Sequence, residues 1–274
     1  MWWRGLCAIA LALCAAAGVA DSGNDRRRLS DQPPALASTA ADVNAEVQFG
    51  RSVAAHVLSR HPLYDDEALN HYVNLIGHTL AASSGRSDLN FYFAVLDTDL
   101  INAYAAPGGY IFVTRGALAV LRDEAELAAV LAHEIAHVSL KHIVRAMNIR
   151  AGNTADGLSG MLSGISDPLR AAFSTAVDQA MSILFQKGLD QSDEFAADQY
   201  AFQLLALTGY DPGAMESMLQ RLRSLSGSIQ TITSTHPTFA LRIDALRATT
   251  ATIDLANIGR VRLAERFLDH VKLK

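Results

Sequence analysis

The feature that most constrains this chain is a group of three ionisable side chains within a long apolar stretch, at His133-Glu134-Ile135-Ala136-His137. The residues from Asp123 to about Met147 are apolar at helical spacing and include no helix breaker, which predicts one long buried helix. Residues four apart lie on one face of a helix, so the two imidazoles project in the same direction. Buried polar groups need partners, and one zinc ion would satisfy both imidazoles. The pattern predicts a zinc site with His133 and His137 as ligands.

Between the two histidines, Glu134 is placed to act on a water at the metal. Zinc lowers the pKa of its water to about 7, and a nearby carboxylate takes the proton as a general base and later returns it to the leaving amine. The HExxH pattern also arises by chance on amphipathic helices, and the pattern alone does not separate the two readings. The apolar flanks favour the metal site, because the three polar groups would otherwise be buried without partners.

A catalytic zinc takes three protein ligands, so a third must come from elsewhere in the chain. His142 lies nine residues after His133, which on a continuous helix is the opposite side, and we interpret it as a structural or surface histidine. Glu194 and Asp198 lie four apart on a predicted helix and share a face. One of these carboxylates can bind zinc while the other accepts the second ring N–H of a ligand histidine. Taken alone, this pair is more typical of a solvated acidic face, but together with the upstream HExxH pattern it favours the metal site.

The rest of the chain predicts an α+β fold that is mainly helical. Three β-rich segments, at 91–96, 101–104 and 110–114, predict a small β-meander whose edge could accept another strand. One helical pattern runs past Gly188 to Leu207. In chain order, the predicted helices begin near residues 43, 69, 123, 169, 214 and 239.

Residues 1–20 have the form of a secretory signal peptide. A basic start at Arg4 precedes the apolar run Leu6 to Ala17, and Gly18-Val19-Ala20 supplies small residues for cleavage. A retained membrane anchor and a lipoprotein cleavage before Cys14 are the alternatives. Both cysteines lie in this segment, so a chain cleaved after it has no disulfide. The pattern predicts export to the periplasm.

Four stretches of the chain form a set that is more specific than HExxH alone: Ile101 to Ile111, His133 to His137, Glu194 to Asp198, and Thr235-His236-Pro237 with Arg242-Ile243. With the helices before them they cover residues 43 to about 248. This set resembles the HtpX-like and BepA-like family of gluzincin zinc metalloendopeptidases, which includes the eukaryotic CAAX prenyl proteases. The chain departs from many members at Ala196, where they carry a second Glu.

The resemblance implies a zincin-like catalytic domain with a small β-sheet beside the HExxH helix, and one Zn²⁺ per chain. It implies zinc ligands at His133, His137 and Glu194, a general base at Glu134, and Asp198 as the support of a ligand histidine. The chain then divides into a signal peptide (1–20), a flexible spacer (21–41), a zinc metalloprotease domain (42–250) and a C-terminal extension (251–274).

His236 and Arg242 are further candidates for the catalytic site, and each has two readings. His236 precedes a predicted helix. It would stabilise the oxyanion or occupy the open zinc position in a resting state, or it would only cap the helix. Arg242 would bind a backbone carbonyl or hold an acidic group of the site, or it would be an ordinary solvated helix charge.

The candidate substrate-binding residues lie on the strand edge before the third β-rich segment: Asn102, Ala103, Tyr104, Gly108 and Gly109. An exposed edge can add an extended peptide through main-chain hydrogen bonds, as a protease requires. A plain core hairpin is the alternative. The Gly-rich residues 151–165 would form a lid over the cleft or have no such role.

These observations predict a zinc endopeptidase that hydrolyses peptide bonds of unfolded or misassembled cell-envelope proteins. The alternatives are a metal-holding chaperone or adaptor of such proteins, and a structural zinc protein. Polypeptides of the envelope are the expected partners, and peripheral membrane association stays open. A net charge of −5 without a run of Lys or Arg argues against nucleic acid as a partner. The sequence does not determine the oligomeric state.

Overall fold

A computed structural model describes residues 38–149, 167–225, 239–251, 253 and 258–273. Several predicted features therefore lie outside the described residues. They are the signal peptide (1–20), most of the spacer (21–41), the Gly-rich stretch (151–165) and His236. Within the described ranges the chain is mainly helical with one small sheet, which confirms the expected α+β class.

The sheet has three strands: β1 (Tyr92–Leu96), β2 (Ala103–Ala106) and β3 (Tyr110–Thr114). Their order is β1-β3-β2, with β1 parallel and β2 antiparallel to β3, so the predicted meander is wrong. The reason lies in the connection 97–102, which carries the chain around the end of β3. There the Thr114 hydroxyl accepts the N–H of Asn102 at 3.1 Å and donates to the Asn102 carbonyl at 2.8 Å.

Side chains of the sheet alternate between two hydrophobic cores, as the two-residue period of a strand requires. One face packs into the main core with α3 (Glu67–Ala81) and α5 (Glu124–Ser139), and its members are Phe93, Val95, Ala105, Ile111 and Val113. The other face packs against α2 (Ala40–Arg60) and α8 (Asp167–Ser182), and its fully buried members are Leu96, Tyr104, Ala106 and Phe112. The sheet is therefore covered on both faces.

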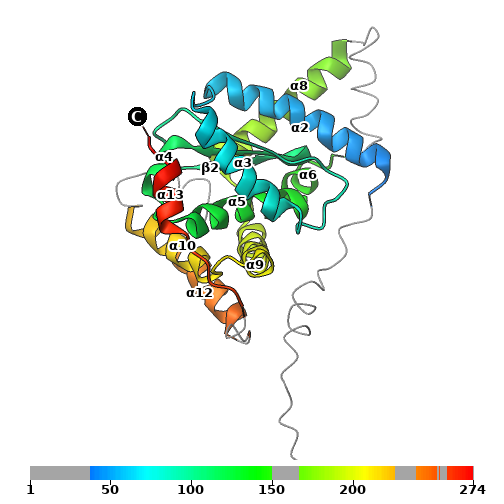
Figure 1. The fold of residues 1–274 in the computed structure, drawn as a ribbon. Helices are drawn as coiled ribbons and strands as arrows, with labels where there is room; N and C mark the ends of the chain where they lie inside the picture. Colours follow the sequence, from blue (N-terminus) through cyan, green and yellow to red (C-terminus); the bar gives the residue numbers. More distant parts are fainter. Residues whose placement is uncertain (1–37, 150–166, 226–238, 252, 254–257, 274) are drawn as a thin grey trace, which may run out of the picture.

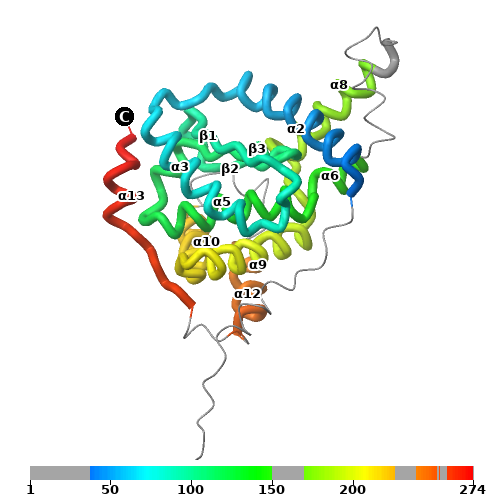
Figure 2. Tube along the Cα trace, turned by 45° about the vertical axis from the view of Figure 1, so that its right-hand side comes forward, coloured from blue at the N-terminus to red at the C-terminus, as the bar shows by residue number. Residues whose placement is uncertain are grey.

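Figures 1 and 2 show the helices as layers on either side of this sheet. α2 crosses one side, and α5 lies on the other with α9 (Gln191–Thr208), α10 (Gly213–Leu225) and α12 (Phe239–Thr250) beyond it. The short helix α4 (Arg115–Val120) connects β3 to α5. α2 approaches the turn η1 (Pro107–Gly109) so closely that a Cβ on Gly50 would lie 1.7 Å from the Pro107 carbonyl oxygen.

Two of the predicted helices are interrupted. α5 ends at Ser139, and Lys141 adopts a left-handed conformation (φ 57°) before α6 (His142–Ala146), so the predicted helix to Met147 is wrong. The carbonyl of Val138 in the last turn of α5 accepts a hydrogen bond from Arg86 at 3.1 Å. The pattern past Gly188 is also broken: α8 passes into a π-helical turn, η3 (Ile183–Lys187), and Gly188 turns the chain with φ 70° before α9.

Residues 258–273 pack back onto the domain. Within this range, α13 (Ala264–His270) places Phe267 in the main core. Arg262 forms ion pairs with Asp123 at the start of α5 and with Asp211 before α10, at 2.9 and 2.8 Å. This segment therefore holds the end of the HExxH helix that lies opposite the histidines.

Among the described residues, the stretch Glu124–Ala146 is long and apolar enough to cross a membrane. However, 89% of its most apolar window is buried inside the protein. The central helix of a globular core has the same composition, and the burial of this helix accounts for its apolar character.

Candidate metal centre

Three potential ligand atoms converge between α5 and α9. The Nε2 atoms of His133 and His137 lie 3.0 Å apart, and the two carboxylate oxygens of Glu194 each lie 3.5 Å from one of them. Ligands of a tetrahedral zinc, at about 2.0–2.1 Å from the ion, lie about 3.3–3.4 Å from one another. The donor set and its spacing therefore fit zinc. Within the described ranges, these three buried residues form the candidate metal-binding group.

Close packing of two helices brings the ligands together. α5 supplies both histidines, and α9 supplies Glu194 in its first turn. The two helices pack against each other and carry fully buried alanines, among them Ala132, Ala136, Ala197 and Ala201. Short side chains let the backbones approach, so that a glutamate from one helix reaches the imidazoles of the other.

The first histidine is held by a charged pair. Asp198 Oδ1 lies 2.9 Å from His133 Nδ1, and Arg242 donates hydrogen bonds to both oxygens of Asp198 at 2.6 and 2.8 Å. Burial and Arg242 lower the pKa of His133, but Asp198 and Glu194 outweigh them and raise it to about 9. Burial favours the neutral acid of Asp198, yet Arg242 and His133 hold its pKa below the usual range. A carboxylate on Nδ1 fixes the orientation of the ring and supports it as a metal ligand through Nε2.

Arg242 is only 3% exposed, so its interpretation as a solvated helix charge is wrong. In addition to its hydrogen bonds with Asp198, Arg242 has its Nη1 atom 3.3 Å from Glu194 Oε2. Its placement matches the alternative in which it holds acidic groups of the site. The guanidinium thus joins the support of His133 to the third potential ligand.

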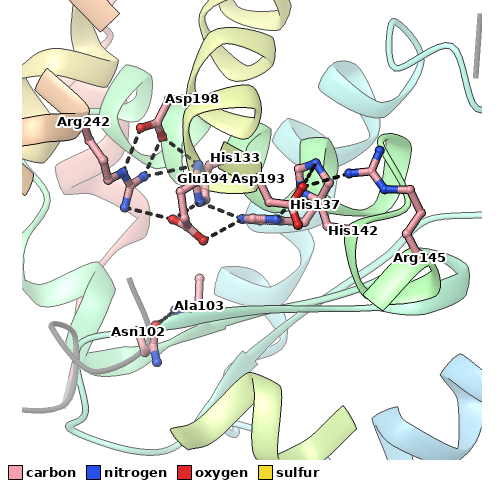
Figure 3. A network of polar contacts seen from close by, with 10 residues as sticks. All are labelled: Asn102, Ala103, His133, His137, His142, Arg145, Asp193, Glu194, Asp198 and Arg242. Atoms are coloured by element: carbon pink, nitrogen blue, oxygen red, sulfur yellow. Dashed lines mark hydrogen bonds and ion pairs between the residues drawn. The ribbon is translucent and has the colours of Figure 1, made fainter. Parts of the chain in front are cut away.

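The second histidine has a different neighbour. His142 Nδ1 lies 2.8 Å from His137 Nδ1, and His142 is 1% exposed. His142 is outside the ligand group, as expected. However, it does not lie on the opposite side of a continuous helix, because the break at Lys141 turns it back toward His137. Burial, then Arg145 and His133, lower the pKa of His142 to about 3, so it is a neutral imidazole. Figure 3 shows His142 beside Asp193 and Arg145, on the side of the site opposite Asp198.

Glu134 is 5% exposed and lines two cavities beside the ligands. The first cavity also contains His133 and Arg242, and its wall is apolar: Val120, Leu121, Val130, Met218, Leu222 and Phe239. The second contains His137 and Glu194, with Tyr104, Ile143, Ile183, Leu184 and Leu189 around them. Glu134 thus borders both cavities, one of which contains His133 and the other His137.

The edge strand β2 follows these cavities. Ala103 lines both, Asn102 lines the first and Tyr104 the second, and Figure 3 shows Asn102 and Ala103 across from the ligands. The side chain of Asn102 accepts the N–H of Ala103 at 2.9 Å. Gly108 and Gly109 differ: both are buried, and a Cβ on Gly108 would meet α2 at 2.7 Å. We interpret them as turn residues, which corrects their prediction as substrate contacts.

The sequence reading assigned no role to Asp193 and Arg145, which complete the neighbourhood of His142. Asp193 Oδ1 lies 2.8 Å from Arg145 Nη2 and 3.5 Å from His142 Nε2, the latter too long for a well-formed hydrogen bond. The sequence did contain one indication of this neighbourhood, a histidine five residues after His137. It could be interpreted only with the helix break in view.

Comparison with known proteins agrees with this geometry. The profile of peptidase family M48 matches residues 67–250. A putative beta-barrel assembly-enhancing protease of Vibrio cholerae is 33% identical over 218 residues, which are 77% of this chain and 45% of that protein. The mitochondrial metalloendopeptidase OMA1 of Schizosaccharomyces pombe is 27% identical over 80% of this chain and 63% of its own length. Metalloprotease LoiP of Escherichia coli is 26% identical over 54% and 58%. The chain thus spans less than two thirds of each relative.

Proposed function

This chain belongs to peptidase family M48, a family of metalloproteases, and on that basis we propose that it is a zinc-dependent endopeptidase. The observation that carries the proposal is the convergence of His133, His137 and Glu194 at tetrahedral spacing, with Glu134 between the histidines. A structural zinc is normally closed by a fourth protein ligand, whereas three ligands leave a position for water and substrate.

The roles of the residues follow from their positions. Bound zinc would supply Lewis-acid chemistry, polarising a carbonyl and lowering the pKa of water to about 7. Glu134 would be the general base of the reaction, holding a proton from the attacking water on its carboxylate and passing it to the leaving amine. Asp198 and Arg242 keep His133 oriented, so Arg242 acts as a positioning residue through Asp198 and Glu194. The role of His236 as an oxyanion group or a plug stays a prediction.

We propose that the substrate is an extended polypeptide lying along β2. Ala103 lines both cavities, so a peptide pairing with this edge would cross the metal site. The apolar wall of the first cavity suits an apolar side chain next to the scissile bond. A peptide library in which one position is varied between Leu and Asp tests this preference. Faster cleavage with Leu is expected, and equal rates would reject an apolar subsite.

We further propose that these polypeptides are unfolded or misassembled proteins of the cell envelope, reached after export to the periplasm. The signal-peptide pattern of residues 1–20 supports export. The name of the Vibrio cholerae relative, a beta-barrel assembly-enhancing protease, supports an envelope substrate. An envelope proteome compared between cells with the wild type and cells with Glu134→Gln would identify substrates as proteins that accumulate in the variant.

The decisive experiment is Glu134→Gln in the zinc-loaded protein. We expect zinc to stay bound while hydrolysis of an unfolded protein such as casein falls about 10²–10⁴-fold, because only the general base is removed. Glu216→Gln, a partly exposed carboxylate on α10 that pairs with Arg247 and lines neither cavity, is the matched control and should retain full activity. Unchanged cleavage by Glu134→Gln with zinc bound would reject the mechanism. Wild-type protein that prevents aggregation without cleaving would instead support the chaperone or adaptor reading.

A further inference from the structure

The two histidines of the metal centre differ in what faces their second ring nitrogen. His133 Nδ1 lies 2.9 Å from a carboxylate oxygen of Asp198, whose charge is balanced by Arg242. His137 Nδ1 lies 2.8 Å from another imidazole, the Nδ1 of His142. In metal sites, the group that receives the second N–H fixes both the tautomer and the orientation of the ligand ring.

The positions of the protons follow from the ligand geometry. Nε2 of His137 faces the metal position, beside His133 Nε2 and Glu194, so its lone pair is directed there. The proton of a neutral His137 is then on Nδ1. A nitrogen 2.8 Å away can accept this proton only through a lone pair, so His142 Nδ1 is unprotonated and its own proton lies on Nε2.

Two charged residues lie outward of that second proton. His142 Nε2 is 3.5 Å from Asp193 Oδ1, too long for a well-formed hydrogen bond, and the same oxygen lies 2.8 Å from Arg145 Nη2. Asp193 belongs to α9 and the other two residues to α6, so both elements contribute to this side of the site (Figure 3). His142 is 1% exposed, whereas the Arg145 side chain is 47% exposed. His142 thus lies between the buried ligand and a charged pair that reaches the surface.

The backbone is strained where it places His142. Lys141 has φ 57° and ψ 37°, a left-handed conformation that is unfavourable for a residue other than glycine. Without this reversal α5 would continue, and its next residues would point away from His137. The reversal and the short Nδ1–Nδ1 distance are independent observations that point to the same contact.

We propose that His142 is a positioning residue for the ligand His137, accepting the Nδ1–H of that ligand and fixing its ring toward the metal. The proposal rests on the zinc site of the proposed function. The centre then has two unlike supports: a carboxylate that adds negative charge behind His133, and a neutral imidazole that orients His137 without adding charge.

The test compares three variants for zinc affinity by competition with a chelator. His142→Phe keeps an aromatic ring but removes the acceptor, and we expect affinity to fall about 10–100-fold, the usual effect of losing such a partner. His142→Asn places Oδ1 near the position of Nδ1 and should recover most of the affinity. His56→Asn, an exposed histidine on α2, is the matched control and should bind zinc like the wild type.

Unchanged zinc affinity in a folded His142→Phe variant would overturn the proposal. So would equal losses in the Phe and Asn variants, since the shape of the side chain and not its acceptor would then matter. If the wild type bound no zinc, the proposed function itself would fail. Failure of the Phe variant to fold is covered by imidazole ¹⁵N NMR of the wild-type zinc form, in which a proton on His142 Nε2 is expected and one on Nδ1 contradicts the proposal.

Discussion

Helix α5 has a buried polar cluster toward each end, and the two clusters differ in which atoms they bring together. At the N-terminal end, Glu124 is fully buried and receives hydrogen bonds from Tyr72 at 2.9 Å, Tyr210 at 2.6 Å and the guanidinium of Arg266. Burial alone would raise the pKa of Glu124, but Arg266 and the two hydroxyls outweigh it and hold the pKa below its usual range. Here acceptors meet donors from the protein.

At the other end, around His133 and His137, atoms that offer lone pairs gather within 3.0–3.5 Å of one another. Two imidazole nitrogens and a carboxylate at these distances are the donor set that a zinc ion binds. The difference teaches how to separate structure from function in one helix. A buried carboxylate surrounded by donors stabilises the fold, and a convergence of acceptors prepares a metal site. Each prediction below changes one end and asks whether the other responds.

The largest expected effect is on the fold. Glu124→Ala leaves the buried hydroxyls of Tyr72 and Tyr210 without their acceptor and removes the partner of Arg266. We expect the free energy of unfolding to fall by about 3 kcal/mol, with zinc affinity of the folded protein unchanged. Urea unfolding and chelator competition measure the two quantities. A large loss of zinc affinity would show that the two ends are coupled.

Glu216→Ala serves as the control for this change. Glu216 pairs with Arg247 on the surface, where the two side chains are 30% and 55% exposed. Exposed pairs contribute about 0–1 kcal/mol, so the variant should unfold nearly like the wild type. A loss as large as that of Glu124→Ala would mean that burial does not distinguish the two carboxylates.

The second prediction is a loss of zinc affinity with little change in stability. Glu194→Ala removes one of the three converging ligands, and we expect zinc affinity to fall by at least about 100-fold, beyond the effect of losing an outer partner. The metal-free protein should unfold within about 1 kcal/mol of the wild type, since Arg242 keeps its two bonds to Asp198. Full zinc content in this variant would reject Glu194 as the third ligand.

The smallest expected effect is that of acid on the Glu124 end. The folded pKa of Glu124 is depressed, so its contribution to stability is complete above the unfolded value of about 4.3 and is lost as pH falls through the lower folded value. The stability difference between the wild type and Glu124→Gln should therefore narrow on acidification below about pH 4. Urea unfolding at several pH values measures it, and a difference that widens would contradict the sign.

Local patterns were sufficient to predict one end of α5 and insufficient for the other. The spacing of His133 and His137 and that of Glu194 and Asp198 depend only on the period of a helix, and these residues lie together in the structure. Nothing near Glu124 indicated that two tyrosines and an arginine from distant segments would surround it. Such partners are set by packing, which one sequence does not reveal.

The same limit explains the errors. The residue at the helix break is a lysine and not a glycine or proline, so the sequence did not indicate the backbone reversal that places His142. Arg242 lies on the same face of α12 as the buried Phe239 and Leu246, and the packing of α12 on α9 places it against Asp198, a partner that the local sequence does not indicate. The order of the strands depends on where the connection 97–102 crosses, a choice that alternation of side chains leaves open.

The order β1-β3-β2 also has a consequence in time. β3 is the last of the three strands to leave the ribosome or a translocation channel, yet it lies between the other two. β1 has no partner in this sheet until residues 110–114 arrive. The β2–β3 hairpin closes across a three-residue turn, a local event on the microsecond scale, whereas the parallel pairing of β1 closes a longer loop. The edge that faces the metal centre thus belongs to the local pairing, which needs no residue of the helix that carries the histidines.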